Sequence, residues 1–311
     1  MIRPVFHTTS ALKQLLILFF VLCAFFIVFA IVSSLGMIAF PKNLNNSRFP
    51  VEYTQYLLFV QGVTMMILPS IVFTFLTNLK PWQSIGMQKI SSFIWIPIAT
   101  VAIISIQPFV EFVGIWNSKM VLPESLGLLE RWMRESEEMT AQITSEILSG
   151  MQTKNIIANF FIMALIPAIG EELIFRGCFQ KVIGKWWNSA HLAIFVTAFL
   201  FSAIHLQFYG FLPRFLLGLL LGYLFYWSKN LWIPIIAHFL NNLMVLLLYY
   251  YYITIGGIDN PLAMKTSSNF PLWAIGVCTL VFALTFFLAF KVYRRAKSLK
   301  LMGLVEETNA Q

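Results

Sequence analysis

Long apolar runs dominate this sequence and decide which solvent the chain can fold in. Eight of them are long enough, or nearly so, to cross a lipid bilayer, and they lie near residues 15–40, 55–79, 91–116, 156–178, 190–209, 211–228, 231–253 and 271–290. A membrane-spanning helix needs about 20 mostly apolar residues. Hydrophobic residues make up 59% of the chain and charged residues only 11%, whereas soluble domains carry about 25% charged residues. We therefore predict an all-α fold with a single membrane domain over residues 1–311, a polytopic membrane helix bundle of about eight transmembrane helices.

The net charge of +8 does not indicate nucleic acid binding, because most basic residues lie in short connections between apolar runs and at the C-terminal end. Cytoplasmic connections of membrane proteins carry an excess of Lys and Arg. Eight spans put both ends on one side. If that side is the cytoplasm, the inner segments hold twelve basic residues and the outer segments seven, with Arg176 and Arg214 left out because they fall within spans. We predict an integral, multi-pass membrane protein with cytoplasmic N- and C-termini and no nucleic acid partner.

The longest polar stretch is the connection at about 117–154. Apolar residues recur in it at near-helical spacing, for example at Leu126, Leu129, Met133 and Met139, between many charged residues. An apolar stripe on a charged helix is typical of a helix that lies at the membrane surface. We predict one or two amphipathic helices at the outer surface, acting either as a solvated linker or as a lid that guides substrate.

Three of the apolar runs contain polar side chains that a plain membrane anchor does not need. In chain order these residues are Glu171, Glu172, Arg176, His205, His238 and Asn242. A charged side chain at the centre of a membrane helix costs roughly 2.5–3.5 kcal/mol on insertion scales. Such residues persist where they neutralise one another or where function requires them.

Helical spacing indicates which of Glu171 and Glu172 is neutralised by a neighbour and which is free for another role. Glu172 and Arg176 are four residues apart, so their side chains lie on one helix face and can form an ion pair. Glu171 is turned away by about 100° on a helix of 3.6 residues per turn. We predict that Glu172–Arg176 is an internal brace and that Glu171 is presented to a different neighbour, either as a second structural ion partner or as a functional carboxylate.

The remaining polar residues complete a possible reaction site. A carboxylate, two imidazoles and an amide on three helices are the groups needed to activate a water molecule and to stabilise an oxyanion. Each group also has a simpler interpretation: a lone His205 is usually a satisfied core residue, and His238 with Asn242 can join helices through hydrogen bonds. Two histidines and a carboxylate can also ligate Zn²⁺ and leave one position for water. Glu171, His205 and His238 would then be the ligands, although the chain has no HExxH motif.

The motifs EExxxR, FxxxH and HxxxN, which begin at Glu171, Phe201 and His238, resemble in order and spacing the signature of the CAAX protease and bacteriocin-processing family of intramembrane proteases. This family includes the type II CAAX prenyl endopeptidase. The resemblance covers about residues 156–245. It implies a membrane-embedded endopeptidase that hydrolyses a peptide bond of a membrane-associated peptide or protein.

The same resemblance assigns roles to residues of this chain. It implies that Glu171 and His205 activate the attacking water and that His238 and Asn242 stabilise the oxyanion, while Glu172 and Arg176 support the site. Metal-dependent and metal-free glutamate mechanisms have both been proposed for the family, so Zn remains an open cofactor. The implied partners are the lipid bilayer and a peptide or lipidated protein substrate.

Two other functions use the same residues. Intramembrane Glu and His also mark the midplane ion sites of transporters, but the sequence shows no internal repeat. The chain could also be a catalytically inactive scaffold or immunity-type protein that keeps the fold. One inconsistency concerns the spans, because these boundaries put His205 nearer the outer end of 190–209 and His238 nearer the inner end of 231–253.

Overall fold

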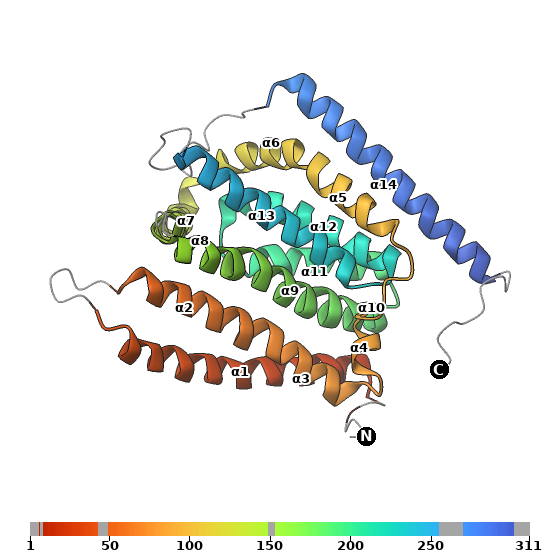
Figure 1. The fold of residues 1–311 in the computed structure, drawn as a ribbon, viewed down its shortest axis with the longest axis horizontal. Coiled ribbons are helices and arrows are strands. Elements are labelled where there is room, and N and C mark those ends of the chain that lie inside the picture. The colour runs from red at the N-terminus through yellow and green to blue at the C-terminus, as the bar shows by residue number, and fades with distance from the viewer. Residues whose placement is uncertain (1–5, 7–8, 43–48, 149–152, 255–269, 302–311) are drawn as a thin grey trace.

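The computed structural model describes residues 6, 9–42, 49–148, 153–254 and 270–301, which form a bundle of helices without any strand among them (Figure 1). The first half contains α1 (Ala11–Ala39), α2 (Val51–Gln61), α3 (Leu68–Thr77), α4 (Pro81–Ser84), α5 (Trp95–Ser105), α6 (Gln107–Ser118) and α7 (Gly127–Leu148). The second half contains α8 (Thr153–Asn159), α9 (Ile166–Glu172), α10 (Lys181–Trp187), α11 (Ala190–Ala203), α12 (Phe211–Ser228), α13 (Trp232–Thr254) and α14 (Leu272–Leu301). π-Helical segments at Gly62–Ile67, Phe160–Leu165 and Leu173–Gln180 join consecutive α-helices into longer rods.

Prolines explain where these rods are irregular. Proline lacks a backbone N–H and clashes with the carbonyl of residue i−4, so a helix interior tolerates it only next to a disturbed turn. Pro69 and Pro167 each lie two residues after the end of a π-helical segment, and Pro108 follows the break between α5 and α6. Pro97, Pro213 and Pro234 instead occupy the first turns of α5, α12 and α13, where the missing donor has no helical partner to lose.

Seven helical stretches within the described residues are long and apolar enough to cross a bilayer, which confirms the predicted polytopic all-α bundle. The predicted span at 190–209 is the exception, because α11 ends at Ala203 after 14 residues. At 1.5 Å per residue it is about 21 Å long, shorter than a hydrocarbon core of about 30 Å. Leu206, with a positive φ of 52°, turns the chain back towards α12.

The fourth predicted span, 156–178, is also corrected. The structure continues this rod as one helix from Lys154 to Trp187, 34 residues in all, and ends it at Asn188 in the left-handed conformation. Lys181 therefore extends the helix, although the sequence analysis placed it in an inner connection. As a result, the acidic pair lies near the middle of the longest rod.

Figure 1 shows that α1 begins and α14 ends at the same end of the bundle, where α4 and α10 also lie. The amphipathic connection forms one helix, α7, which Figure 1 shows end-on at the opposite end, across the direction of the spans. Residues 149–152 of this connection lie outside the described part of the chain. Among the residues counted for orientation, Arg3, Arg48 and Lys265 also lie outside it.

The outward surface of the bundle is apolar. On α1, the side chains of Phe19, Phe20 and Phe26 are 59%, 67% and 58% exposed, respectively. Monomeric soluble proteins rarely expose contiguous apolar surfaces of this kind. These helices therefore fit a lipid environment, and the polar residues gather inside, between α9, α11, α12 and α13.

The charge bias predicts which end of the bundle faces the cytoplasm. We expect a cysteine introduced at Glu138, which is exposed on α7, to react with a membrane-impermeant maleimide in intact cells. A cysteine at Arg295 should react only after the membrane is opened. Both variants are made in a Cys23→Ser background, because Cys23 is itself exposed. The opposite pattern of labelling would invert the predicted orientation.

Candidate active site

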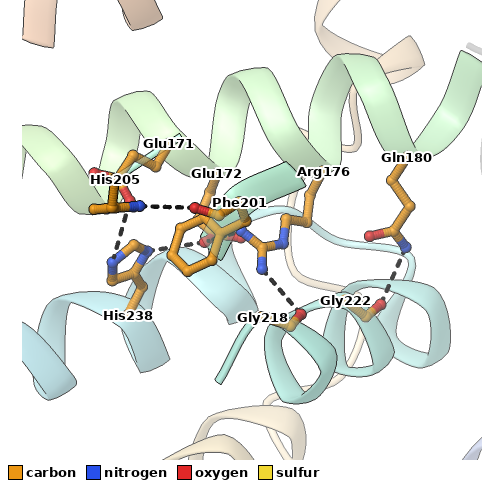
Figure 2. A network of polar contacts seen from close by, with 9 residues as sticks. All are labelled: Glu171, Glu172, Arg176, Gln180, Phe201, His205, Gly218, Gly222 and His238. Carbon is orange, nitrogen blue, oxygen red and sulfur yellow. Dashed lines mark hydrogen bonds and ion pairs between the residues drawn. The ribbon is translucent and has the colours of Figure 1, made fainter. Parts of the chain in front are cut away.

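The centre of the site is the ion pair between Glu172 and Arg176, both of which are fully buried. Arg176 Nη1 lies 2.9 Å from Glu172 Oε1, so the structure contains the brace that the four-residue spacing predicted. Arg176 Nη2 also donates to the carbonyl oxygen of Gly218 at 3.0 Å (Figure 2). One guanidinium thus joins the long fourth rod to α12.

Two glycines of α12, which the sequence did not single out, allow this helix to pack closely against α11. A Cβ atom at Gly218 would lie 3.1 Å from Ala198, and one at Gly222 would lie 2.8 Å from Ile194 Cγ2. The carbonyl of Gly222 accepts a hydrogen bond from Gln180 Nε2 at 3.1 Å, parallel to the Arg176 contact (Figure 2). Two glycines four residues apart are a known signal for close packing of membrane helices.

His238 on α13 connects the brace to the second glutamate. Its Nδ1 lies 2.9 Å from Glu172 Oε1, and its Nε2 lies 3.7 Å from Glu171 Oε2. A carboxylate that pairs with Arg176 can only accept hydrogen bonds, so His238 donates through Nδ1–H. Glu172 therefore fixes the ring so that Nε2 faces Glu171.

His205 is also oriented by a hydrogen bond, but it lies beyond the end of α11 rather than within a spanning helix. It lies in the turn just after α11, and its Nδ1 is 2.7 Å from the carbonyl oxygen of Phe201. A carbonyl oxygen only accepts, so the proton is on Nδ1 and the lone pair is on Nε2. The ring of Phe201 packs against Arg176 (4.8 Å to Cζ), His205 (5.3 Å between centroids) and His238 (5.9 Å).

All four residues predicted to carry the chemistry line one cavity of about 440 Å³, namely Glu171, His205, His238 and Asn242. The short α11 removes the inconsistency in depth between the two histidines, because its end lies inside the bundle. The side chain of Glu171 is 17% exposed whereas that of Glu172 is 0% exposed. The structure therefore presents Glu171, and not its neighbour, to a molecule in the cavity.

A chain of amides orients Asn242. Gln107 Nε2 donates to Asn241 Oδ1 at 3.0 Å, and Asn241 Nδ2 donates to Asn242 Oδ1 at 3.2 Å. The carbonyl end of Asn242 is thus occupied as an acceptor, so its Nδ2 is the end with donors to offer. Thr144 and Leu148 of α7 also line the cavity, which brings the amphipathic helix next to the site.

Arg214 is a cavity residue that the sequence analysis passed over. Its Nη1 and Nη2 donate to Gln207 Oε1 and to the Gln207 carbonyl oxygen at 2.6 and 2.5 Å. No carboxylate of the described residues lies within ion-pair distance of it. An ionisable residue inside a predicted span is in itself a signal of function, so the sequence did contain a way to find it.

The fit of a metal can be judged from the side chains present. Zinc sites of hydrolases use three protein ligands and leave one position for water. Within the described ranges, no three His, Cys, Asp or Glu side chains are arranged so that they could hold one ion. Glu171, His205 and His238 line the cavity together but do not, as they stand, form the ligand set that the sequence allowed.

Comparison with known proteins finds similarity in the segment that carries this site. Residues 153–244 match the family model described as type II CAAX prenyl endopeptidase Rce1-like. The uncharacterized protein YpbD of Bacillus subtilis (strain 168) is 29% identical over 92 residues, which is 28% of this chain and 44% of YpbD. The chain thus spans less than half the length of this relative, and no solved structure matches it significantly. The matched segment runs from α8 to α13 and includes Glu171, His205, His238 and Asn242, so this part of the chain is similar to the Rce1-like type II CAAX prenyl endopeptidase family.

Proposed function

We propose that this protein is an intramembrane endopeptidase that hydrolyses a peptide bond of a membrane-associated peptide or protein. The observation that carries the proposal is the single cavity shared by Glu171, His205, His238 and Asn242. These residues come from three segments of the bundle and line its interior together. The match of residues 153–244 to the Rce1-like family supports the same reaction class.

In the proposed reaction, Glu171 acts as the general base. It takes a proton from a water molecule, and His205 Nε2, which carries a lone pair, accepts the second hydrogen of that water and orients it. The water oxygen bonds to the scissile carbonyl carbon, and the carbonyl electrons move to its oxygen. The C–N bond then breaks, and the proton held by Glu171 passes to the leaving amine.

The oxyanion formed in this step needs donors. Asn242 Nδ2 supplies one, and protonated His238 supplies a second through Nε2–H. With Glu171 and Glu172 ionised and Arg176 charged, a second ring proton on His238, carried by Nε2, makes this group of four side chains neutral. A neutral group is the arrangement that costs least in a buried site. Glu172 is then a positioning residue that holds His238 by Nδ1.

The cavity lining indicates the substrate class. Apolar residues such as Leu217, Leu221 and Val245 form much of it, which suits an apolar or lipidated peptide. Arg214 adds a cation at the same wall, and guanidinium groups bind carboxylates through paired hydrogen bonds. We therefore propose a lipid-modified or strongly apolar peptide with a carboxylate near the cleaved bond.

The direct test uses purified protein in phosphatidylcholine vesicles and a quenched fluorescent peptide with a farnesylated cysteine near its carboxyl terminus. The matched peptide lacks the farnesyl group. We expect cleavage of the lipidated peptide, and we expect it to persist in the presence of a chelator, because the ligand set for zinc is not assembled. Loss of cleavage on chelation, with recovery on adding Zn²⁺, would replace the glutamate mechanism by a metal-dependent one. Cleavage of neither peptide would leave the transporter and scaffold functions as the better hypotheses.

The oxyanion role of Asn242 gives a separate prediction. Asn242→Ala removes one donor, and deleting a single oxyanion donor lowers kcat by about 10²–10³-fold. Asn242→Asp keeps the shape but replaces the donor by an acceptor, so it should be at least as inactive. Asn242→Ala should keep the thermal stability of the parent, measured in the same detergent. An Asn242→Ala protein that retains kcat within about threefold would remove this residue from the reaction.

A further inference from the structure

A second cavity, of about 610 Å³, lies at the end of the bundle where α1 begins and α14 ends, and it shares no lining residue with the candidate active site. Its walls come from α4 and the residues after it, from α10, from the start of α11 and from the end of α12. The polar side chains that line it are Gln83, Gln88, Gln180, Lys181, Asn188, Ser189 and Lys229. A cavity of this composition is unlike the apolar space around Glu171.

The charge in this cavity is of one sign. No Asp or Glu occurs between Glu52 and Glu111 or between Glu172 and Asp259, and the segments that form the cavity lie in these two ranges. Within the part of the chain that the structure describes, no carboxylate pairs with the two lysines of the cavity. Among the described residues, both ammonium groups are thus without a carboxylate partner.

Instead of a carboxylate, the two lysines contact a backbone carbonyl oxygen and aromatic rings. Lys181 Nζ donates to the carbonyl oxygen of Ser84 and lies 5.1 Å from the ring centroid of Phe225. Lys229 Nζ lies 4.0 Å from the ring centroid of Tyr226. Burial lowers the pKa of Lys229, and the nearby positive charge of Lys297 lowers it further. A bound anion would remove this cost.

The position of the cavity relative to the membrane surface indicates where such an anion would come from. Trp82, Trp186, Trp187 and Trp232 are all 38–46% exposed, and they lie on α4, α10 and the start of α13, next to the cavity walls. Tryptophan is enriched at the level of the lipid headgroups. The positive-inside bias assigns this end to the cytoplasmic leaflet, where anionic lipids are found.

We propose that this cavity binds a phosphate group, carried by the headgroup of an anionic phospholipid or by a free phosphate ion. Lys181 and Lys229 supply the positive charge, and the amide and hydroxyl groups around them supply further hydrogen-bond donors. The site is independent of the proposed peptidase reaction. It anchors the long fourth rod, on which Glu171 and Glu172 lie, to the end of α12.

Native mass spectrometry of the full-length protein in detergent tests this proposal, with phosphatidylglycerol, phosphatidylcholine and inorganic phosphate as probes. We expect phosphatidylglycerol to bind more tightly than phosphatidylcholine. A lysine near anionic lipid headgroups contributes about fivefold to affinity, so Lys181→Gln and Lys229→Asn should each weaken binding about fivefold, and the double variant about 25-fold. Asn is chosen at Lys229 because the φ there is 55°, and Asn tolerates positive φ.

Lys185→Gln is the matched control, since Lys185 lies one turn along α10, is exposed and is not part of the cavity. If Lys181→Gln fails to fold, Lys229→Asn provides the same test.

Displacement of the lipid by inorganic phosphate, with the same dependence on the two lysines, would support the proposal with free phosphate as the source. Lysine-dependent lipid binding that phosphate does not displace would support it with the headgroup as the source. If Lys185→Gln weakens binding as much as the cavity variants do, or if no variant changes it, the proposal is overturned.

Discussion

Replacing Glu171 by Gln should lower the turnover of lipidated peptide by about 10²–10⁴-fold or more, the usual contribution of general acid–base catalysis. Gln keeps the shape of the side chain and removes its basicity. The substitution should not unfold the protein, because it removes a charge from inside the membrane and leaves the Glu172–Arg176 pair intact. The measurement is kcat for the same peptide in vesicles, together with the midpoint of thermal unfolding.

Glu138→Gln on α7 is the matched control for this experiment, since it makes the same chemical change at an exposed position outside the cavity. Its kcat should equal that of the parent protein. A Glu171→Gln variant with unchanged cleavage would exclude Glu171 as the base, and with it the proposed reaction as assigned. Parent protein that folds but cleaves nothing would instead favour the scaffold function, so the two failures can be told apart.

Arg176→Ala should destabilise the folded protein strongly. The substitution leaves the fully buried carboxylate of Glu172 without its cation and the carbonyl of Gly218 without its donor. Breaking a buried ion pair by removing one partner costs roughly 3–5 kcal/mol. We expect a clear fall in the thermal midpoint and in the yield of folded protein, and a loss of activity because His238 is no longer held by a fixed Glu172.

Arg134→Ala offers a control with the same spacing. Glu130 and Arg134 are also four residues apart and are paired at 2.6 Å, but the side chain of Arg134 is 46% exposed. Exposed pairs contribute about 0–1 kcal/mol, so this variant should remain close to the parent in stability. Arg176→Lys should recover only part of the loss, because an ammonium group lacks the planar fork that reaches both Glu172 and Gly218. Equal stability of the Arg176→Ala and Arg134→Ala proteins would show that burial does not matter here.

Much of the fold could be predicted from sequence because membrane insertion depends on local composition. A run of about 20 apolar residues makes a spanning helix the expected structure, and most of the predicted runs are helices in the structure. The failures are at boundaries. The short α11 depends on a turn at Leu206, for which a leucine gives no local signal, and the extension of the fourth rod to Trp187 depends on packing around Lys181.

The candidate site residues could also be identified from the sequence, because they too depend on local composition. A polar side chain in an apolar run is costly, so Glu171, Glu172, Arg176, His205, His238 and Asn242 stood out without any structure. Helical spacing was also enough to pair Glu172 with Arg176, because residues four apart meet whatever surrounds them. These conclusions rest on local rules that hold within one helix.

Which side chains of different helices meet could be learned only from the tertiary structure. Only the packing of α13 against α9 shows that His238 binds Glu172 and leaves Glu171 facing the cavity. The same holds for the packing of α12 through Gly218 and for the cavity around Lys181 and Lys229. The sequence specifies which groups each helix carries and on which face. Which faces meet, and at what depth, is decided by the fit of neighbouring helices, a property that no single segment contains.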